Sequence, residues 1–229
     1  MGSASTQLTF DLPHLAATGA EDFMVSAANR AASDLVECWP DWPTNAVALS
    51  GPAGVGKSHL VDIWLHRSGA VRVAASEVNE SMMSQLLEAS AVAVEDLDCG
   101  TIDEKALFHL FNHARTGRTY LLVTLKCEPG DLEIALPDLR SRLRAMPSVR
   151  IERPDEALLH VLLVKLFADR QLNIEPSVIK YLSTHMERSA EVAVRAVAEI
   201  DRIALATHRK ATPALAGQAL RNLSHAKLD

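Results

Sequence analysis

A glycine-rich segment that ends in a lysine and a serine is the part of this sequence best suited to chemistry. It runs Gly51-Pro52-Ala53-Gly54-Val55-Gly56-Lys57-Ser58 and matches the phosphate-loop pattern G-x-x-x-x-G-K-[ST] at every fixed position. The glycines let backbone N–H groups turn inward around phosphate oxygens, and the helix expected from His59 onward points its positive end at the same anion. Lys57 can reach the β- and γ-phosphates, and the Ser58 hydroxyl can ligate Mg²⁺. We therefore predict that residues 51–59 bind a nucleoside di- or triphosphate with Mg²⁺; a glycine-rich turn that binds nothing is the alternative.

Two adjacent carboxylates, Glu95 and Asp96, end an apolar run at 91–94. In phosphate-loop proteins an acid at such a strand end holds Mg²⁺, directly or through water, and a second acid can polarise the attacking water. We assign Glu95, together with Ser58, to the metal and Asp96 to the water, and the reverse assignment stays open. The alternative is a solvated acidic strand end.

A basic segment at 136–143 contains two arginines, Arg140 and Arg142, just before the last expected strand. An arginine at this place could reach the γ-phosphate of a neighbouring subunit and stabilise charge in the transition state. The residue types fit a solvated basic helix end equally well.

Strands and helices must alternate to position these groups. The hydrophobic pattern predicts a helix at 26–38, followed by strands at 46–50, 71–74, 91–94, 120–124 and 148–151. Helices at 59–66, 80–88 and 104–116 lie between the first four of these strands. Such alternation implies an α/β fold with a parallel sheet covered by helices on both faces. Beyond Pro154 the pattern is helical throughout, at 156–170, 176–186, 190–207 and 213–224. We therefore divide the chain into an N-terminal arm (1–20), a nucleotide-binding α/β domain (21–153) and a small helical lid domain (154–229).

Composition limits the functions that this chain can have. The chain has 229 residues and a net charge of −6, which disfavours tight non-specific binding to nucleic acid. Hydrophobic residues make up 48% and aromatic residues 4%, so the core must be aliphatic. Cys38, Cys99 and Cys127 are far apart, as expected for reduced thiols of a cytoplasmic protein. We find neither a signal-peptide pattern nor an apolar run that approaches the ~20 residues of a membrane span, and expect no membrane association.

The order of these motifs resembles that of the AAA+ ATPases, and within them the family of the bacterial replication initiator DnaA and its short relative Hda. The resemblance covers about residues 7 to 223. Phe111-Asn112 is similar to the family's Phe-Asn pair, and 200–202 with 208–212 is similar to the end of the Hda lid. Leu139-Arg140-Ser141-Arg142-Leu143 resembles the box that carries the arginine finger, which places that role on Arg142. The resemblance also implies an adenine nucleotide, ADP or ATP, with Phe23 and Val25 beside the base.

Three positions depart from the family pattern. Glu95 stands where the family usually has aspartate, and Lys126 stands where the relatives usually have an acidic residue. In the lid, Glu191 occupies the position of the sensor II arginine, which contacts the nucleotide phosphates. Arg188 and Arg195 lie nearby and could replace it. Whether this chain hydrolyses ATP itself is therefore open.

The arm contains Gln7, Leu8, Phe10 and Leu12, spaced as in the Q-L-x-[L/F] peptides that bind the bacterial sliding clamp. An extended peptide can place its apolar side chains in a preformed pocket while the glutamine amide makes directional hydrogen bonds. Hda carries such a motif in its own N-terminal arm. The alternative is an arm that folds back on its own domain.

The resemblance implies a regulator of bacterial replication initiation. It would bind adenine nucleotide and the sliding clamp, and stimulate ATP hydrolysis by DnaA in the cytoplasm, at the replisome. DnaA continues into a DNA-binding domain, whereas this chain stops at Asp229, so we expect no sequence-specific DNA binding. The alternatives are a helicase-loader or transposition-helper ATPase, an adaptor for another clamp-linked process, and a P-loop kinase. The sequence leaves open whether copies of the chain form a homo-oligomer.

Overall fold

Five parallel strands form the central sheet of the protein. The computed structural model describes residues 23–207 and 209–225. The strands are β1 (Ala46–Ser50), β2 (Val71–Ala74), β3 (Ala91–Glu95), β4 (Tyr120–Leu125) and β5 (Ser148–Arg150), in the order β2-β3-β4-β1-β5. β1, β3 and β4 are buried along nearly their whole length, which explains why their sequences are continuous apolar runs. The predicted α/β fold with a parallel sheet is confirmed.

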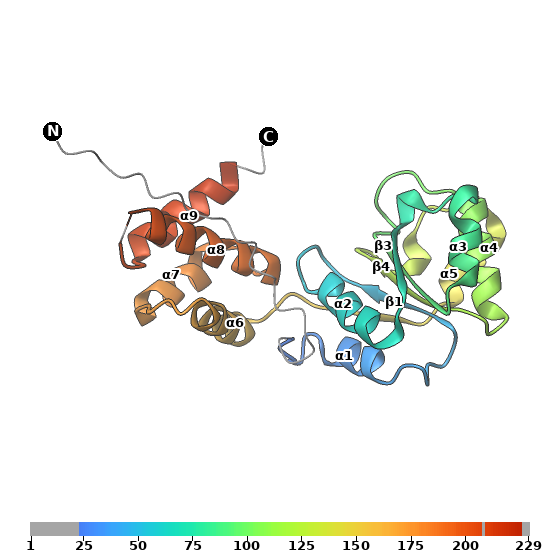
Figure 1. Cartoon of the computed structure of the whole chain (residues 1–229), viewed down its shortest axis with the longest axis horizontal. Coiled ribbons are helices and arrows are strands. Elements are labelled where there is room, and N and C mark those ends of the chain that lie inside the picture. Colours follow the sequence, from blue (N-terminus) through green and yellow to red (C-terminus); the bar gives the residue numbers. More distant parts are fainter. Residues whose placement is uncertain (1–22, 208, 226–229) are drawn as a thin grey trace.

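Helices cover both faces of this sheet (Figure 1). On one face α1 (Arg30–Glu37) and α2 (Lys57–Ser68) enclose a core that includes Val36, Leu60 and Trp64. On the other face lie α3 (Met83–Glu88), α4 (Glu104–Arg115) and α5 (Pro137–Ala145), whose apolar side chains share a second core with the sheet. Three short 3₁₀ turns, η2 (Ala75–Glu77), η3 (Glu80–Met82) and η4 (Pro129–Asp131), lie in the connections.

The remaining helices form a lid with a core of its own (Figure 1). They are α6 (Glu156–Asp169), α7 (Pro176–His185), α8 (Ala190–Thr207) and α9 (Pro213–His225). Their shared core is aliphatic apart from Phe167, and it includes Leu159, Leu163, Leu182, Val197 and Ile200. None of the helices in the described part of the chain is long and apolar enough to cross a membrane.

Two predicted helices begin later than the sequence pattern indicates. α1 starts at Arg30 instead of 26, because the Asn29 side chain accepts a hydrogen bond from the Ser26 N–H and donates one to the Met24 carbonyl, which holds a turn there. The helix predicted at 80–88 is split into η3 and α3. The Asn79 side chain accepts from the N–H groups of Ser81 and Met82, an Asx-type cap that competes with regular helix.

Candidate nucleotide-binding site

The predicted phosphate loop and acidic pair meet at the carboxyl-terminal ends of the central strands, here called one edge of the sheet. The loop follows β1, Glu95 ends β3, and Thr124 lies near the end of β4, the strand between them. Because all strands are parallel, their carboxyl ends point the same way, and Val94 of β3 pairs with Val123 of β4 while Leu49 of β1 pairs with Thr124. In open α/β sheets ligands bind at this edge.

The phosphate loop adopts a glycine-dependent conformation around Lys57. Gly51, Gly54 and Gly56 have φ angles of +143°, +73° and +106°, values that other residues rarely adopt. A Cβ on Gly51 would lie 2.3 Å from the Ile151 carbonyl oxygen. The buried Lys57 donates hydrogen bonds to the carbonyls of Gly51 (2.6 Å) and Pro52 (2.9 Å). The ammonium thus lies within the loop, where an anion held by the loop amides would meet it.

Burial lowers the pKa of the Lys57 ammonium, and the negative charges of Asp96 and Asp98 partly offset this effect. A cation that has lost part of its hydration interacts more strongly with a phosphate than an exposed one does. The environment of Lys57 therefore favours an anionic ligand.

The Ser58 hydroxyl and the Glu95 carboxylate, proposed from sequence as metal ligands, lie together. Ser58 Oγ donates a hydrogen bond of 2.9 Å to Glu95 Oε2. The other carboxylate oxygen, Oε1, accepts from Arg72 Nε at 2.7 Å, and Arg72 also pairs with Asp62. Oxygen donors of this kind suit Mg²⁺, so the residues present fit the ion. When bound, Mg²⁺ neutralises phosphate charge, and Arg72 fixes the direction of the carboxylate that would hold it.

Asp96 is held in an unusual backbone conformation next to this pair. Its φ is +56°, in the left-handed region, and its N–H donates to Thr124 Oγ1 at 3.0 Å. Its side chain is exposed at the sheet edge. This places the carboxylate in solvent beside the loop, where a water molecule could be polarised.

Lys126, one of the three departures noted in the sequence, lies beside Asp98 and Cys99. Its N–H donates to Asp98 Oδ2 at 2.7 Å, and its ammonium donates to Cys99 Sγ at 3.1 Å. The hydrogen bond with Cys99 raises the pKa of Lys126. The ammonium is thus engaged by the loop that follows β3.

A small pocket between the phosphate loop and the lid fits the expected position of the base. Phe23 and His59 line it and contact each other edge to face, with ring centroids 5.3 Å apart. Met24 also lines this pocket, whereas Val25, predicted beside the base, is 43% exposed. The remaining lining is mainly apolar and includes Val55, Leu158, Leu162 and Ala190.

The lid contacts the phosphate loop through the start of α8. The Gly54 carbonyl accepts hydrogen bonds from Ala190 N (2.9 Å), Glu191 N (3.3 Å) and Ser189 Oγ (3.2 Å). Ser189 is 3% exposed, and an added Cβ on Gly54 would lie 3.3 Å from Glu191 Oε2. A carboxylate therefore stands against the loop at the position where the sequence resemblance led us to expect an arginine.

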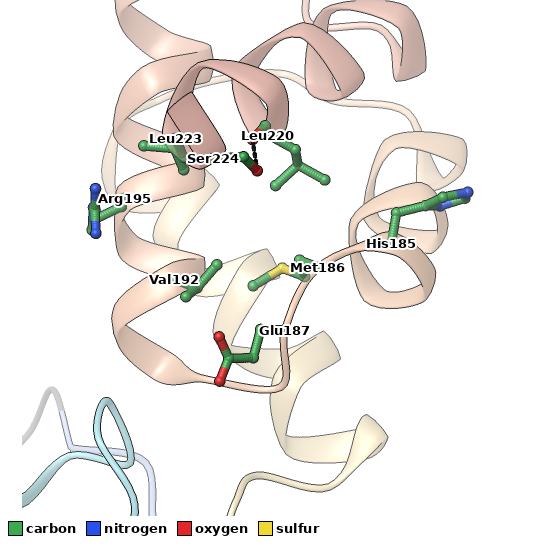
Figure 2. Close-up of a pocket in the computed structure, with 8 residues that line it drawn as sticks. All are labelled: His185, Met186, Glu187, Val192, Arg195, Leu220, Leu223 and Ser224. Carbon is green, nitrogen blue, oxygen red and sulfur yellow. Dashed lines mark hydrogen bonds between the residues drawn. The ribbon is translucent and has the colours of Figure 1, made fainter. Parts of the chain in front are cut away.

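Each of the two arginines proposed as substitutes is paired with a carboxylate. Arg188 NH2 lies 3.9 Å from Glu156 Oε2, and Arg195 NH1 lies 3.8 Å from Glu191 Oε1. Arg195 lines a groove within the lid that is formed by the ends of α7 and α9 and the start of α8 (Figure 2). Either arginine would have to leave its present partner to reach a nucleotide phosphate.

We expect Gly54→Ala to destabilise the contact between the loop and the lid. The new Cβ would meet Ser189 Oγ at 2.2 Å, and the left-handed φ is unfavourable for alanine by roughly 1–2 kcal/mol. Thermal unfolding of the variant should show a larger loss of stability than Gly117→Ala. Gly117 has a similar φ of +81° but no atom near its Cβ position, so this control measures the backbone cost alone. Equal losses of thermal stability in Gly54→Ala and Gly117→Ala would mean that the lid moves away from the new Cβ at no cost in free energy.

Comparison with known proteins identifies the fold. No protein-family model matches the sequence. An uncharacterized protein of Haemophilus influenzae is 26% identical over 175 residues, which is 71% of this chain and 75% of that protein. Domain III of the Thermotoga maritima replication initiation protein DnaA is similar in structure, with a TM-score of 0.74 and 16% identity over 88% of this chain and 95% of that domain. The fold is that of the AAA+ ATPases.

Two longer AAA+ structures are also similar to this chain. AMPPCP-bound DnaA from Aquifex aeolicus has a TM-score of 0.68 at 18% identity, covering 80% of this chain and 63% of that one. The Thermotoga maritima RuvB Holliday junction branch migration motor has a TM-score of 0.61 at 15% identity, covering 78% and 61%. This chain therefore spans somewhat less than two thirds of each of these two AAA+ proteins.

Arg142, the predicted finger, lies at the opposite edge of the AAA+ sheet from the phosphate loop. It lines a pocket with Asn45 and Ala46, where β1 begins, whereas the loop starts where β1 ends. Five strand residues separate the two edges by about 16 Å. The guanidinium lies over the Phe108 ring, 5.2 Å from its centroid. Arg142 therefore lies at the end of the sheet away from the phosphate loop of its own chain.

Two residues of the site, Arg72 and Ser189, were not predicted from the sequence. Arg72 lies on β2 and pairs with the carboxylate of β3, and no local pattern marks it. Ser189 has the type and place of a helix N-cap, since its Oγ accepts from Val192 N at 3.3 Å, and that signal could have been found. Its contact with Gly54, 135 residues away, could not. Gln7, Leu8, Phe10 and Leu12 lie outside the described residues.

Proposed function

We propose that this AAA+ protein binds an adenine nucleotide with Mg²⁺ and regulates bacterial replication initiation by stimulating ATP hydrolysis on DnaA. The observation that carries the proposal is the separation of two phosphate-directed features. The phosphate loop with Lys57 lies at one edge of the sheet, and Arg142 lies at the other. An arginine so placed can act on a nucleotide only in another molecule, as trans-acting fingers do.

Several observations support an adenine nucleotide in the chain's own site. The AAA+ structures similar to this chain include DnaA bound to AMPPCP. The pocket beside the loop is mainly apolar and is lined by Phe23 and His59, which suits a flat purine ring. Ser58 and Glu95 supply oxygen donors of the kind that Mg²⁺ prefers.

The nucleotide of this chain would act mainly as a structural ligand. The pocket is lined by both the loop residues Val55 and Gly56 and the lid residues Leu158 and Leu162, so a bound base would join the two parts. Glu191 stands against the loop where a positive sensor would favour hydrolysis. ADP or ATP would therefore set the position of the lid more than it would serve as a substrate.

The arm would tether the protein to the sliding clamp. Burial of Leu8 and Phe10 in a clamp pocket is worth about 3–6 kcal/mol before ordering costs. Fixing each arm residue costs ~1–2 kcal/mol, so the net contact should be moderate, in the micromolar range. A protein held in this way would meet DnaA near newly replicated DNA.

We predict that replacing Gln7, Leu8 and Phe10 together with alanine abolishes clamp binding. Nucleotide affinity and thermal stability should stay nearly unchanged, because the body from Phe23 onward already has its own cores. Surface plasmon resonance on immobilised clamp measures the first effect, and calorimetry with ADP measures the second. Unfolding or loss of ADP binding in the triple variant would instead indicate an arm that packs on its own domain.

A reconstituted assay tests the whole proposal. DnaA-ATP and DNA-loaded clamp are incubated with and without this protein, and the conversion of bound ATP to ADP is followed. We expect faster hydrolysis only when both this protein and the clamp are present. Specific, nanomolar binding of duplex DNA by this protein alone would contradict the proposed role and favour a DNA-acting AAA+ protein.

A further inference from the structure

We infer that Arg115 and Arg142 together form an oxyanion site that takes a phosphoryl group supplied from outside the chain. This inference rests on the proposed function in identifying that group as the γ-phosphate on a partner AAA+ protein. It assigns a role to Arg115, which no motif marks. Arg115 is the last residue of α4, and Arg142 lies in the last turn of α5.

The two arginines share one pocket. The pocket has a volume of about 180 Å³ and lies at the edge of the sheet where β1 begins. The other lining residues are apolar or uncharged and include Phe111, Met146, Pro147, Thr44 and Asn45. Among the lining residues, Arg115 and Arg142 carry the charge, and both are positive.

Neither positive charge is neutralised by the described part of the protein. Among the described residues, neither Arg115 nor Arg142 forms an ion pair with a carboxylate. The Arg142 Nε atom is buried and has no hydrogen-bond partner there, and the guanidinium contacts the face of Phe108 instead. A buried donor without an acceptor is costly, so a ligand that supplies oxygen atoms would be stabilised at this point.

The difference in exposure gives the two arginines different parts in binding. Arg115 is exposed, and Arg142 is half-buried. An anion that approaches the pocket would therefore meet Arg115 at the mouth before it reaches Arg142. Guanidinium groups bind phosphate oxygens in a planar, two-pronged geometry, and two of them can hold one phosphoryl group from two sides. The binding of an anion would also relieve the repulsion between the two like charges.

A simpler role for these arginines is to complement the negative ends of α4 and α5. Cations near helix C-termini are stabilising, and Arg144 lies in the same last turn of α5 as Arg142. Arg144 is exposed and is absent from the lining of the pocket. Arg144 is therefore a matched control. If the arginines only complement the helix dipole, alanine substitution at Arg144 and at Arg142 should have the same effect.

The first experiment measures the anion site directly and does not depend on DnaA. The full chain is saturated with ADP and Mg²⁺ so that its phosphate loop is filled, and sodium pyrophosphate is then added. Arginine Nε–Hε resonances are followed by NMR and assigned by their absence in the variants Arg115→Ala, Arg142→Ala and Arg144→Ala. We expect the Arg115 and Arg142 resonances to shift with one common dissociation constant, while the Arg144 resonance stays. Unchanged resonances, or equal shifts of all three, would overturn the site.

The second experiment separates the site from the proposed function. In the assay with DnaA-ATP and loaded clamp, Arg115→Ala should lower the stimulated hydrolysis rate about 10²-fold, as the loss of one transition-state donor does. Arg115→Lys should recover part of the rate, and Arg144→Ala should not change it. If the parent protein and Arg115→Ala stimulate DnaA equally, the role of Arg115 is refuted, while the proposed function stands. If pyrophosphate binds at Arg115 and Arg142 but the protein does not stimulate DnaA, the oxyanion site is supported and the proposed function is rejected.

Discussion

Lys57→Ala should weaken the binding of ADP and ATP by about 100-fold or more, equivalent to ~2.7 kcal/mol. The Lys57 ammonium is buried in the loop and held by two loop carbonyls, so it is already placed for an anion. Alanine removes the charge and leaves the loop amides as the remaining phosphate donors. Isothermal calorimetry with ADP and Mg²⁺ measures the change.

Two controls make this result specific to the phosphate site. Lys105→Ala removes an exposed lysine from α4 and should leave ADP affinity unchanged. The thermal unfolding of nucleotide-free Lys57→Ala shows separately whether the loss of its two hydrogen bonds weakens the fold. Undiminished ADP binding by a folded Lys57→Ala protein would reject the assignment of the phosphate loop.

Local sequence patterns predicted most of the elements that carry the site. The bounds of β1 and β2 agree with the sequence prediction, and so do those of α8. β1 is a short apolar run that ends before Gly51, and α8 begins directly after its N-cap Ser189, so local pattern and tertiary burial favour the same structure there. The split of the 80–88 helix shows the opposite case, because the Asn79 side chain offers its neighbours a competing hydrogen bond.

Contacts between remote segments could not be predicted in the same way. The sheet order places β4 between β1 and β3, and this order determines that Glu95 and Ser58 meet. Arg72 pairs with Glu95 because β2 lies beside β3, and Ser189 meets Gly54 because the lid folds back on the loop. Each of these contacts depends on the packing of whole elements, which the spacing of residues within one segment does not encode.

Arg142→Ala should abolish the stimulation of DnaA's ATP hydrolysis, lowering the stimulated rate by about 10³-fold or more. A finger stabilises charge that develops in the transition state of the partner's reaction, so its loss changes the rate and leaves ground-state binding nearly intact. Binding of ADP should be unchanged because Arg142 lies at the opposite edge of the sheet from the chain's own loop. Clamp binding should also be unchanged, since we assign it to the arm.

The setting of Arg142 defines the controls for this prediction. The side chain is half-buried over Phe108, so part of any loss could come from the fold, and thermal unfolding of the variant measures that part. Arg142→Lys keeps the charge but loses the planar two-pronged geometry, and it should restore stability more fully than rate. Arg144→Ala, in the same turn of α5, should retain full activity. If a stable Arg142→Ala protein still stimulates hydrolysis fully, Arg142 is not the finger. The role would then pass to Arg140, an exposed arginine two residues earlier on α5, because a trans-acting finger must lie on a surface that a partner can reach.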